Sequence, residues 1–108
     1  MVEVIFPTSG PVLAGEERER TYAEHQPEYM PLRTLVGVTE QGRVLSRWRP
    51  TPEQRKMIAE GKDIFLVLLT FHRPLAPSMM LIADDSDAVE LKEIIGLPNG
   101  ELAPAEAP

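Results

Sequence analysis

The stretch RVLSRWRPTPEQRKMIAEG, residues 43–61, decides the fold, because it changes from strand to helix within a few residues. Its first seven residues alternate between two sides, as the side chains of a β-strand do. Thr51 is a preferred helix N-cap, Pro52 takes the first helical position, and Gln54 completes a capping box. Gly61 supplies the left-handed residue that ends many helices. The stretch therefore predicts a strand followed by a short helix with a signal at each end.

Upstream of this stretch, residues 33–39 form a second β-rich run. The connection Glu40-Gln41-Gly42 places glycine where a hairpin needs a positive φ, so the two runs are predicted to pair. Residues 2–6 predict a short strand, ended by Pro7 and the turn that follows. Residues 21–31 are polar and interrupted by proline, which predicts an ordered but irregular segment.

Downstream, residues 63–71 are a continuous apolar run, which predicts a central strand with both faces buried. Residues 78–83, rich in methionine and leucine, predict another strand. Asp87 and Glu90 offer a second capping box for a helix that Gly96 closes. This element order predicts an α+β domain, a small mostly antiparallel β-sheet with one or two short helices on one face.

Length and composition are those of one small domain. The chain has 108 residues, too few for two domains, and its low aromatic share of 6% predicts an aliphatic core. Residues 1–97 are predicted to be a single α+β domain, and residues 98–108, rich in proline, alanine and glutamate, a disordered tail. The absence of cysteine excludes disulfides and favours a reducing cytoplasm. No signal peptide is expected, and no apolar run approaches the roughly 20 residues that span a bilayer.

The distribution of charge is uneven. The net charge of −6 argues against general nucleic-acid binding, which depends on neutralising phosphates. Residues 43–62 have the opposite sign, because they hold six Arg and Lys residues and only two glutamates. A basic window in an acidic chain predicts a localised site rather than a general affinity for polyanions.

The basic window contains the predicted ligand-binding residues. On a continuous strand Arg43, Arg47 and Arg49 would share one face, and Arg55 and Lys56 follow on the helix. Arginine binds phosphate and carboxylate bidentately, so this face predicts a site for a compact anion or an acidic protein patch. The alternative is that the strand arginines pair with carboxylates on a solvated surface. The candidate partners in that case are Glu17, Glu19 and Glu24.

Three aromatic or imidazole side chains accompany this window. Tyr29 and His72 complete the predicted ligand-binding set, although Tyr29 would equally suit the core. Trp48, the only tryptophan, lies on the strand face opposite the arginines. It is predicted to be part of the core rather than a stacking platform.

No catalytic constellation is recognisable. His25 and His72 are far apart in sequence, and neither lies in a pattern that pairs a nucleophile with a base. The acidic groups at 24–28 and 84–87 lack a metal-ligand spacing, and the second suits a helix N-terminus, which favours negative charge. The chain is therefore predicted to be no enzyme and to hold neither cofactor nor metal.

Three separated motifs occur in order along the middle of the chain. They are QPEYMPL at 26–32, WRPT at 48–51 and TFHRPLAP at 70–77. The pattern resembles small bacteriophage-encoded proteins that carry a QPEYxPL segment, a W-x-x-[ST] helix start and a TFxxPLxP segment. The resemblance covers about half the chain and implies a viral accessory protein made in the bacterial cytoplasm. It implies no particular activity.

The leading hypothesis is a non-enzymatic phage accessory protein that acts by binding. It would be a homo-oligomer that sequesters an anionic small molecule, such as a host nucleotide signal, or masks a host protein. Residues 64–69 and 79–82 suggest the oligomer, because two short helices do not easily cover such apolar runs. The alternative is a structural or assembly component of the virion, and a third hypothesis is a hydrolase that uses His25 or His72.

Overall fold

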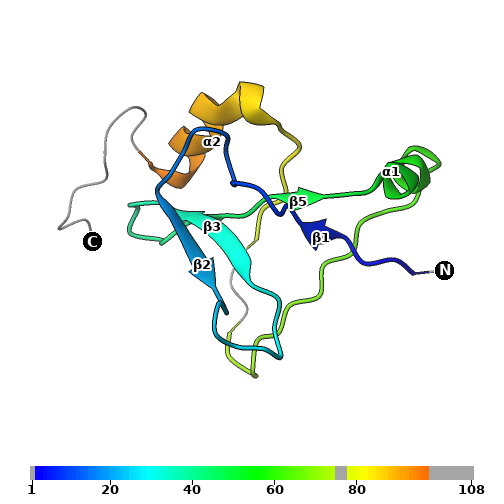
Figure 1. The fold of residues 1–108 in the computed structure, drawn as a ribbon, viewed down its shortest axis with the longest axis horizontal. Coiled ribbons are helices and arrows are strands. Elements are labelled where there is room, and N and C mark those ends of the chain that lie inside the picture. The colour runs from blue at the N-terminus through cyan, green and yellow to red at the C-terminus, as the bar shows by residue number, and fades with distance from the viewer. Residues whose placement is uncertain (1, 75–77, 98–108) are drawn as a thin grey trace.

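The computed structural model describes residues 2–74 and 78–97. Its strands form two antiparallel sheets, a two-stranded sheet of β1 and β5 and a three-stranded sheet in the order β2-β3-β4. The α+β class is confirmed, although two small sheets replace the single one predicted. Residues 98–108, predicted to be a disordered tail, lie outside the described residues. The elements, shown in Figure 1, are β1 (Phe6–Pro7), β2 (Glu19–Tyr22), β3 (Leu32–Val36), β4 (Val44–Leu45), β5 (Trp48–Arg49), α1 (Pro52–Ala59), the 3₁₀ helix η1 (Asp85–Asp87) and α2 (Ala88–Ile95).

The three-stranded sheet contains the predicted hairpin. β3 pairs with β4 through Leu35 opposite Leu45, and Gly42 has the positive φ of +63° that the connection was expected to need. β2 pairs with the other edge of β3, from Glu19 opposite Leu35 to Tyr22 opposite Leu32. Sequence analysis missed β2, since the segment from residue 21 was expected to be irregular and the residues before it are charged.

The core lies between this sheet and α2. Leu35 of β3 is fully buried, and the loop before β2 and the α2 region supply the rest. The predicted aliphatic composition is confirmed, because none of the buried hydrophobic residues in 2–74 and 78–97 is aromatic. The cluster comprises Val12, Leu13, Leu35, Leu91, Ile95 and Leu97.

α1 begins and ends as its sequence predicts. The Thr51 hydroxyl accepts the Gln54 backbone N–H at 3.1 Å, and the Gln54 side-chain oxygen accepts the Thr51 N–H at 2.9 Å. Gly61 follows the helix with a φ of +102°. Gln54 is itself buried and donates from its amide nitrogen to the Val4 carbonyl at 2.9 Å. α1 is thus anchored to the N-terminal segment and contributes no residue to the core cluster.

The start of α2 differs from the prediction. The capping box joins Asp84 to Asp87, not Asp87 to Glu90, because the 3₁₀ turn η1 makes the chain helical three residues earlier. Asp87 makes no side-chain cap hydrogen bond to α2. The predicted C-terminus is confirmed, since Gly96 is left-handed with a φ of +76°.

The predicted strand over residues 43–49 is divided. β4 joins the three-stranded sheet and β5 joins the other, with Ser46 and Arg47 between them. The prediction that Trp48 is buried is wrong, because the residue is 50% exposed and its Nε1 donates to the Ser46 hydroxyl at 2.9 Å. Of the strand predicted over residues 2–6, only Phe6 lies in β1. Pro7, which was expected to end the strand, is its second residue and pairs with Trp48.

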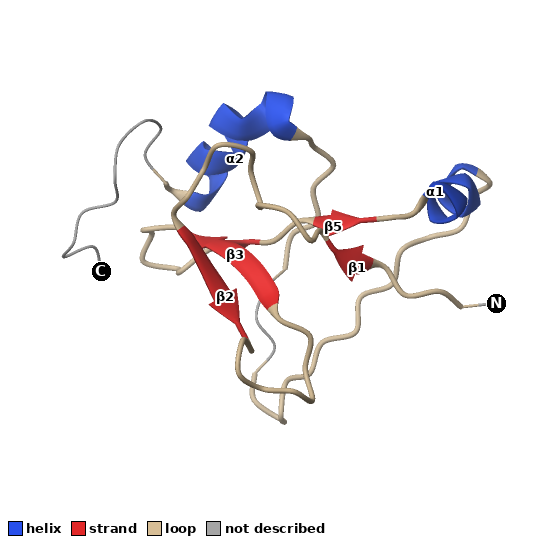
Figure 2. Cartoon of the chain, in the orientation of Figure 1, coloured by secondary structure: helices blue, strands red, loops and turns tan. Residues whose placement is uncertain are grey.

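The strands predicted at 63–71 and 78–83 are absent from the two sheets. Both segments are without helix or strand and are drawn as loop in Figure 2, and nearly every residue in them is exposed. Their sequences favour β-structure, but a strand needs a neighbour to complete its ladder. Within the described residues, no strand lies beside them to supply it.

Candidate functional site

Arg43 is used within the fold. Its guanidinium Nη1 donates to the Ile94 carbonyl oxygen near the C-terminus of α2, at 2.6 Å. The last carbonyls of a helix lack partners inside the helix and carry partial negative charge, so a cation there is stabilising. Arg43 therefore fastens the β3–β4 hairpin to α2.

Arg47 has a similar structural role. Its Nη1 donates to the Asp85 carboxylate at 2.9 Å and to the Val12 carbonyl at 3.3 Å. Asp85 also accepts the Ala14 N–H at 3.0 Å. The Ala14 hydrogen bond first, and then Arg47, hold the pKa of Asp85 below its usual range. An aspartate of η1, and not one of the three expected glutamates, is the partner of Arg47.

Three cations of the predicted ligand-binding set are left for an external ligand, and we call Arg49, Arg55 and Lys56 the basic edge. All three are exposed. Arg55 Nε donates to the Pro50 carbonyl at 3.2 Å, so its guanidinium folds back from α1 to the backbone beside Arg49. Within the described part of the chain, the side chains of Arg49 and Lys56 make no hydrogen bond or ion pair. The charge of Arg49 is felt at Asp85, where it helps to lower the pKa of the carboxyl. The predicted basic face thus loses Arg43 and Arg47 to the fold and keeps only the basic edge.

Tyr29 and His72 lie in turns. Within the described residues, neither side chain makes a hydrogen bond or an ion pair with the basic edge. Both are exposed, and the Tyr29 N–H donates to the Gln26 carbonyl at 3.0 Å. His72 has a φ of +64°, which belongs to a turn described further below. In residues 2–74 and 78–97, neither side chain makes a hydrogen bond or an ion pair.

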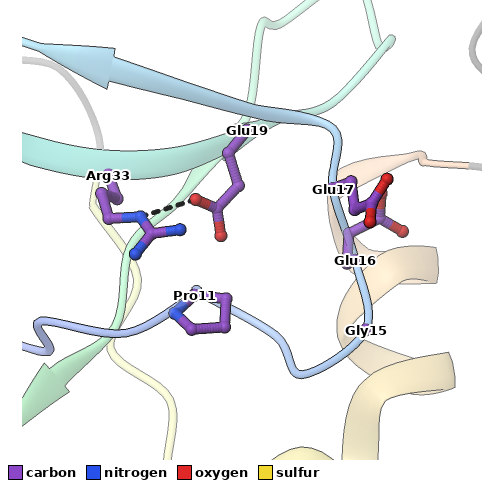
Figure 3. Close-up of a pocket in the computed structure, with 6 residues that line it drawn as sticks. All are labelled: Pro11, Gly15, Glu16, Glu17, Glu19 and Arg33. Atoms are coloured by element: carbon purple, nitrogen blue, oxygen red, sulfur yellow. Dashed lines mark hydrogen bonds and ion pairs between the residues drawn. The ribbon is translucent and has the colours of Figure 1, made fainter.

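A hollow of about 370 Å³ opens elsewhere on the surface, and sequence reasoning did not find it. In Figure 3 the Glu19 carboxylate points to Arg33, while Glu16 and Glu17 lie on the neighbouring loop. Glu19 accepts Arg33 Nε at 2.7 Å and the Val12 N–H at 2.7 Å. Both oxygens of this carboxylate are therefore occupied by the fold, so it is not a free acid for chemistry.

Glu16, on the rim of the same hollow, is held as an anion. Its carboxylate accepts Arg18 Nε at 2.7 Å and lies 3.3 Å from Lys92 Nζ. The Arg18 hydrogen bonds, opposed by burial and aided by Lys92, lower its pKa to about 2. A carboxylate held ionised in this way is poorly suited to general acid–base work near neutral pH. Its role is to join the loop before β2 to α2.

The described residues also contain no cluster suited to a metal. No group of three His, Cys, Asp or Glu side chains comes together among them. The same residues include no helix with the length and apolar character needed to cross a membrane. Of the sequence-predicted site residues, Arg43 and Arg47 bind other parts of the fold. The basic edge is the part of the predicted site that remains as a surface for a ligand.

Comparisons with known protein families, with curated proteins and with solved structures find no match to this chain. The resemblance to bacteriophage proteins accordingly stays a prediction.

Proposed function

We propose that this chain is a non-enzymatic binding protein that holds an anionic small molecule, carrying phosphate or carboxylate groups, at its basic edge. The observation that carries the proposal is the placement of Arg55. Its guanidinium returns to the Pro50 carbonyl, next to Arg49, and both side chains remain exposed.

Arginine suits this role because its planar guanidinium offers several N–H donors in a fixed fork. The bond to Pro50 takes up only Nε of Arg55, which leaves the terminal nitrogens to donate to a ligand. Arg49 and Lys56 add charge at the same end of the molecule. Two forks and an ammonium group match a compact anion with several oxygens.

The acidic remainder of the chain restricts the kind of ligand. A net charge of −6 repels long polyanions, which gain affinity by covering many phosphates. A small anion needs only the local field of a few cations. We therefore favour a small molecule over nucleic acid.

The cellular setting of the proposal is a bacterium infected by a phage. It rests on the three motifs that resemble phage accessory proteins. In that setting the protein acts by occupancy, as a homo-oligomer that withdraws its ligand from the host. The exposed apolar runs at 64–69 and 79–82 support the oligomer.

Thermal unfolding with inorganic pyrophosphate as the probe tests the site. A ligand that binds only the folded state raises Tm with its concentration. We expect pyrophosphate to raise Tm of the wild type and to have little effect on Arg49→Glu or Arg55→Glu.

The matched control is Arg20→Glu. Arg20 is an exposed arginine on the other sheet, and its side chain has no partner among the residues that the structure describes. Arg20→Glu should respond like the wild type. Equal shifts in all four proteins would show that pyrophosphate acts through overall charge, and the proposal would be wrong.

A further inference from the structure

A hairpin-type turn lies at residues 70–73. The Arg73 N–H donates to the Thr70 carbonyl at 3.0 Å, which closes a four-residue turn. The two central residues, Phe71 and His72, have φ values of +52° and +64°. Positive φ at both central positions is the mark of type I′ turns, which connect the strands of two-residue hairpins.

This turn is costly where it stands. Phe and His have a Cβ and do not favour the left-handed region, so such residues persist when surrounding structure holds them there. Paired strands on either side would do so. Yet the arm that enters the turn, residues 63–69, belongs to no sheet within the described chain.

The same arm has the composition of a central strand. Residues 64–69 read IFLVLL, so both faces of a strand formed here would be apolar. Its side chains are all exposed, including Val67 at 90%. Residues 79–82, MMLI, are exposed in the same way, and neither run contains a charge. Identical copies can therefore meet along these runs without bringing like charges together.

The core of one copy is small for a chain of this length. Six hydrophobic residues are buried in the described part, whereas 11 large hydrophobic residues of the two runs and the turn are exposed. Those 11 present apolar surface on the order of 1,000 Å², enough for the roughly 800 Å² that each partner buries in a standard interface. A partner that covers these 11 side chains must be present whenever the protein is made. A second copy of the chain always is.

We infer that two copies of this chain pair antiparallel along residues 64–69, and that residues 79–82 pack on the paired strands. The inference deepens the proposed function. It rests on that proposal in one respect, that the working form is a homo-oligomer. Pairing satisfies the backbone groups along one edge of the arm, buries both apolar runs and fixes the arm that enters the turn at Phe71 and His72. A two-fold axis makes the contact self-complementary and closed.

Light scattering after gel filtration of the full chain tests the assembly. The wild type should have at least twice the 12.1 kDa mass of one chain. Val67→Asp should lower that mass, because it places a charge in the interface. Val2→Asp, at a valine that is 96% exposed, is the matched control and should leave the mass unchanged. A folded wild-type monomer, or a polydisperse aggregate, would overturn the inference.

Single cysteines, introduced one at a time at residues 64–69, test the pairing without a destabilising charge. The chain has no cysteine of its own, so any disulfide joins two copies. Antiparallel pairing about a two-fold axis sets one residue directly opposite its own copy, with Cα atoms about 4.5–5.5 Å apart, within disulfide reach. We expect rapid disulfide-linked dimers at one of these positions and not at Val2→Cys. A dimeric protein that forms none of them pairs elsewhere, which would contradict the inference whether or not pyrophosphate binds.

Discussion

Leu35 is the residue around which the core is organised. It lies on the central strand β3, is 0% exposed, and packs in the cluster that includes Leu91 and Ile95 of α2. Leu35→Ala should lower the free energy of unfolding by about 2–5 kcal/mol, the usual cost of a buried leucine with the cavity left behind. Chemical denaturation measures this difference. Val2→Ala, at an exposed site, should change stability by less than about 0.5 kcal/mol, and equal effects would contradict the assignment of the core.

Glu16 predicts a pH dependence of stability. Its pKa falls from 4.5 in the unfolded reference to about 2 in the fold, so its stabilising effect is complete above about 4.5. The effect is lost as pH falls from there towards 2. The free energies of unfolding of the wild type and of Glu16→Gln should therefore differ most above pH 5 and converge in acid. A difference that stays constant from pH 6 to pH 3 would show that the ion pairs do not set the pKa.

For single residues, the sequence predicts those contacts that form between residues close together in the chain. Thr51, Gln54 and Gly61 were identified because helix caps involve residues a few positions apart. Arg43 and Arg47 were assigned to a ligand, yet the Ile94 carbonyl is 51 positions from Arg43 and Asp85 is 38 positions from Arg47. Only the folded chain brings such partners together.

Among the elements, α1 depends on its N-cap. It has eight residues and contributes nothing to the core cluster, so packing compensates little for the loss of a cap. Thr51→Ala should cost about 1 kcal/mol of unfolding free energy, because the Gln54 N–H loses its acceptor. Thr51→Ser keeps the hydroxyl and should retain most of the stability in the same urea titration. If both variants match the wild type, α1 is not held by this cap.

The approach of β3 to α2 depends on Gly37, which directly follows β3. A Cβ at this position would lie 1.6 Å from the Ile95 carbonyl oxygen, so any larger residue must push the end of α2 away. Gly37→Ala should cost about 1–3 kcal/mol or more, as overpacking does. Gly10→Ala, whose nearest recorded atom would be 3.8 Å away, is the control and should be well tolerated. A near-wild-type Tm for Gly37→Ala would contradict the packing of α2 on the hairpin.

Periodicity identified the β3–β4 hairpin correctly but overestimated other strands. The alternation over 43–49 is real in sequence, yet the chain divides it between two sheets at Ser46 and Arg47. Residues 63–71 have strong strand character and no neighbour within the described chain. Composition states what a segment favours, whereas pairing depends on which edges the rest of the fold, or another copy, makes available.

For the whole molecule, an interface formed with folding makes stability depend on concentration. If the native state is an assembly and the unfolded state is a single chain, mass action raises Tm with protein concentration. We expect a higher Tm for the wild type after a tenfold increase in concentration and a smaller rise for Val67→Asp. Calorimetry at two concentrations measures both, with Val2→Asp as the control. An unchanged wild-type Tm would indicate that folding does not require a second copy.

Native mass spectrometry of the full chain, purified gently from bacterial cells, tests the central claim most directly, because one spectrum reports both subunit number and retained small molecules. The account predicts an assembly of at least two 12.1 kDa chains that carries an anionic mass, and Arg49→Glu should keep the assembly and lose that mass. A bare 12.1 kDa monomer, folded and without a bound mass, would contradict the account of an oligomeric anion-binding protein.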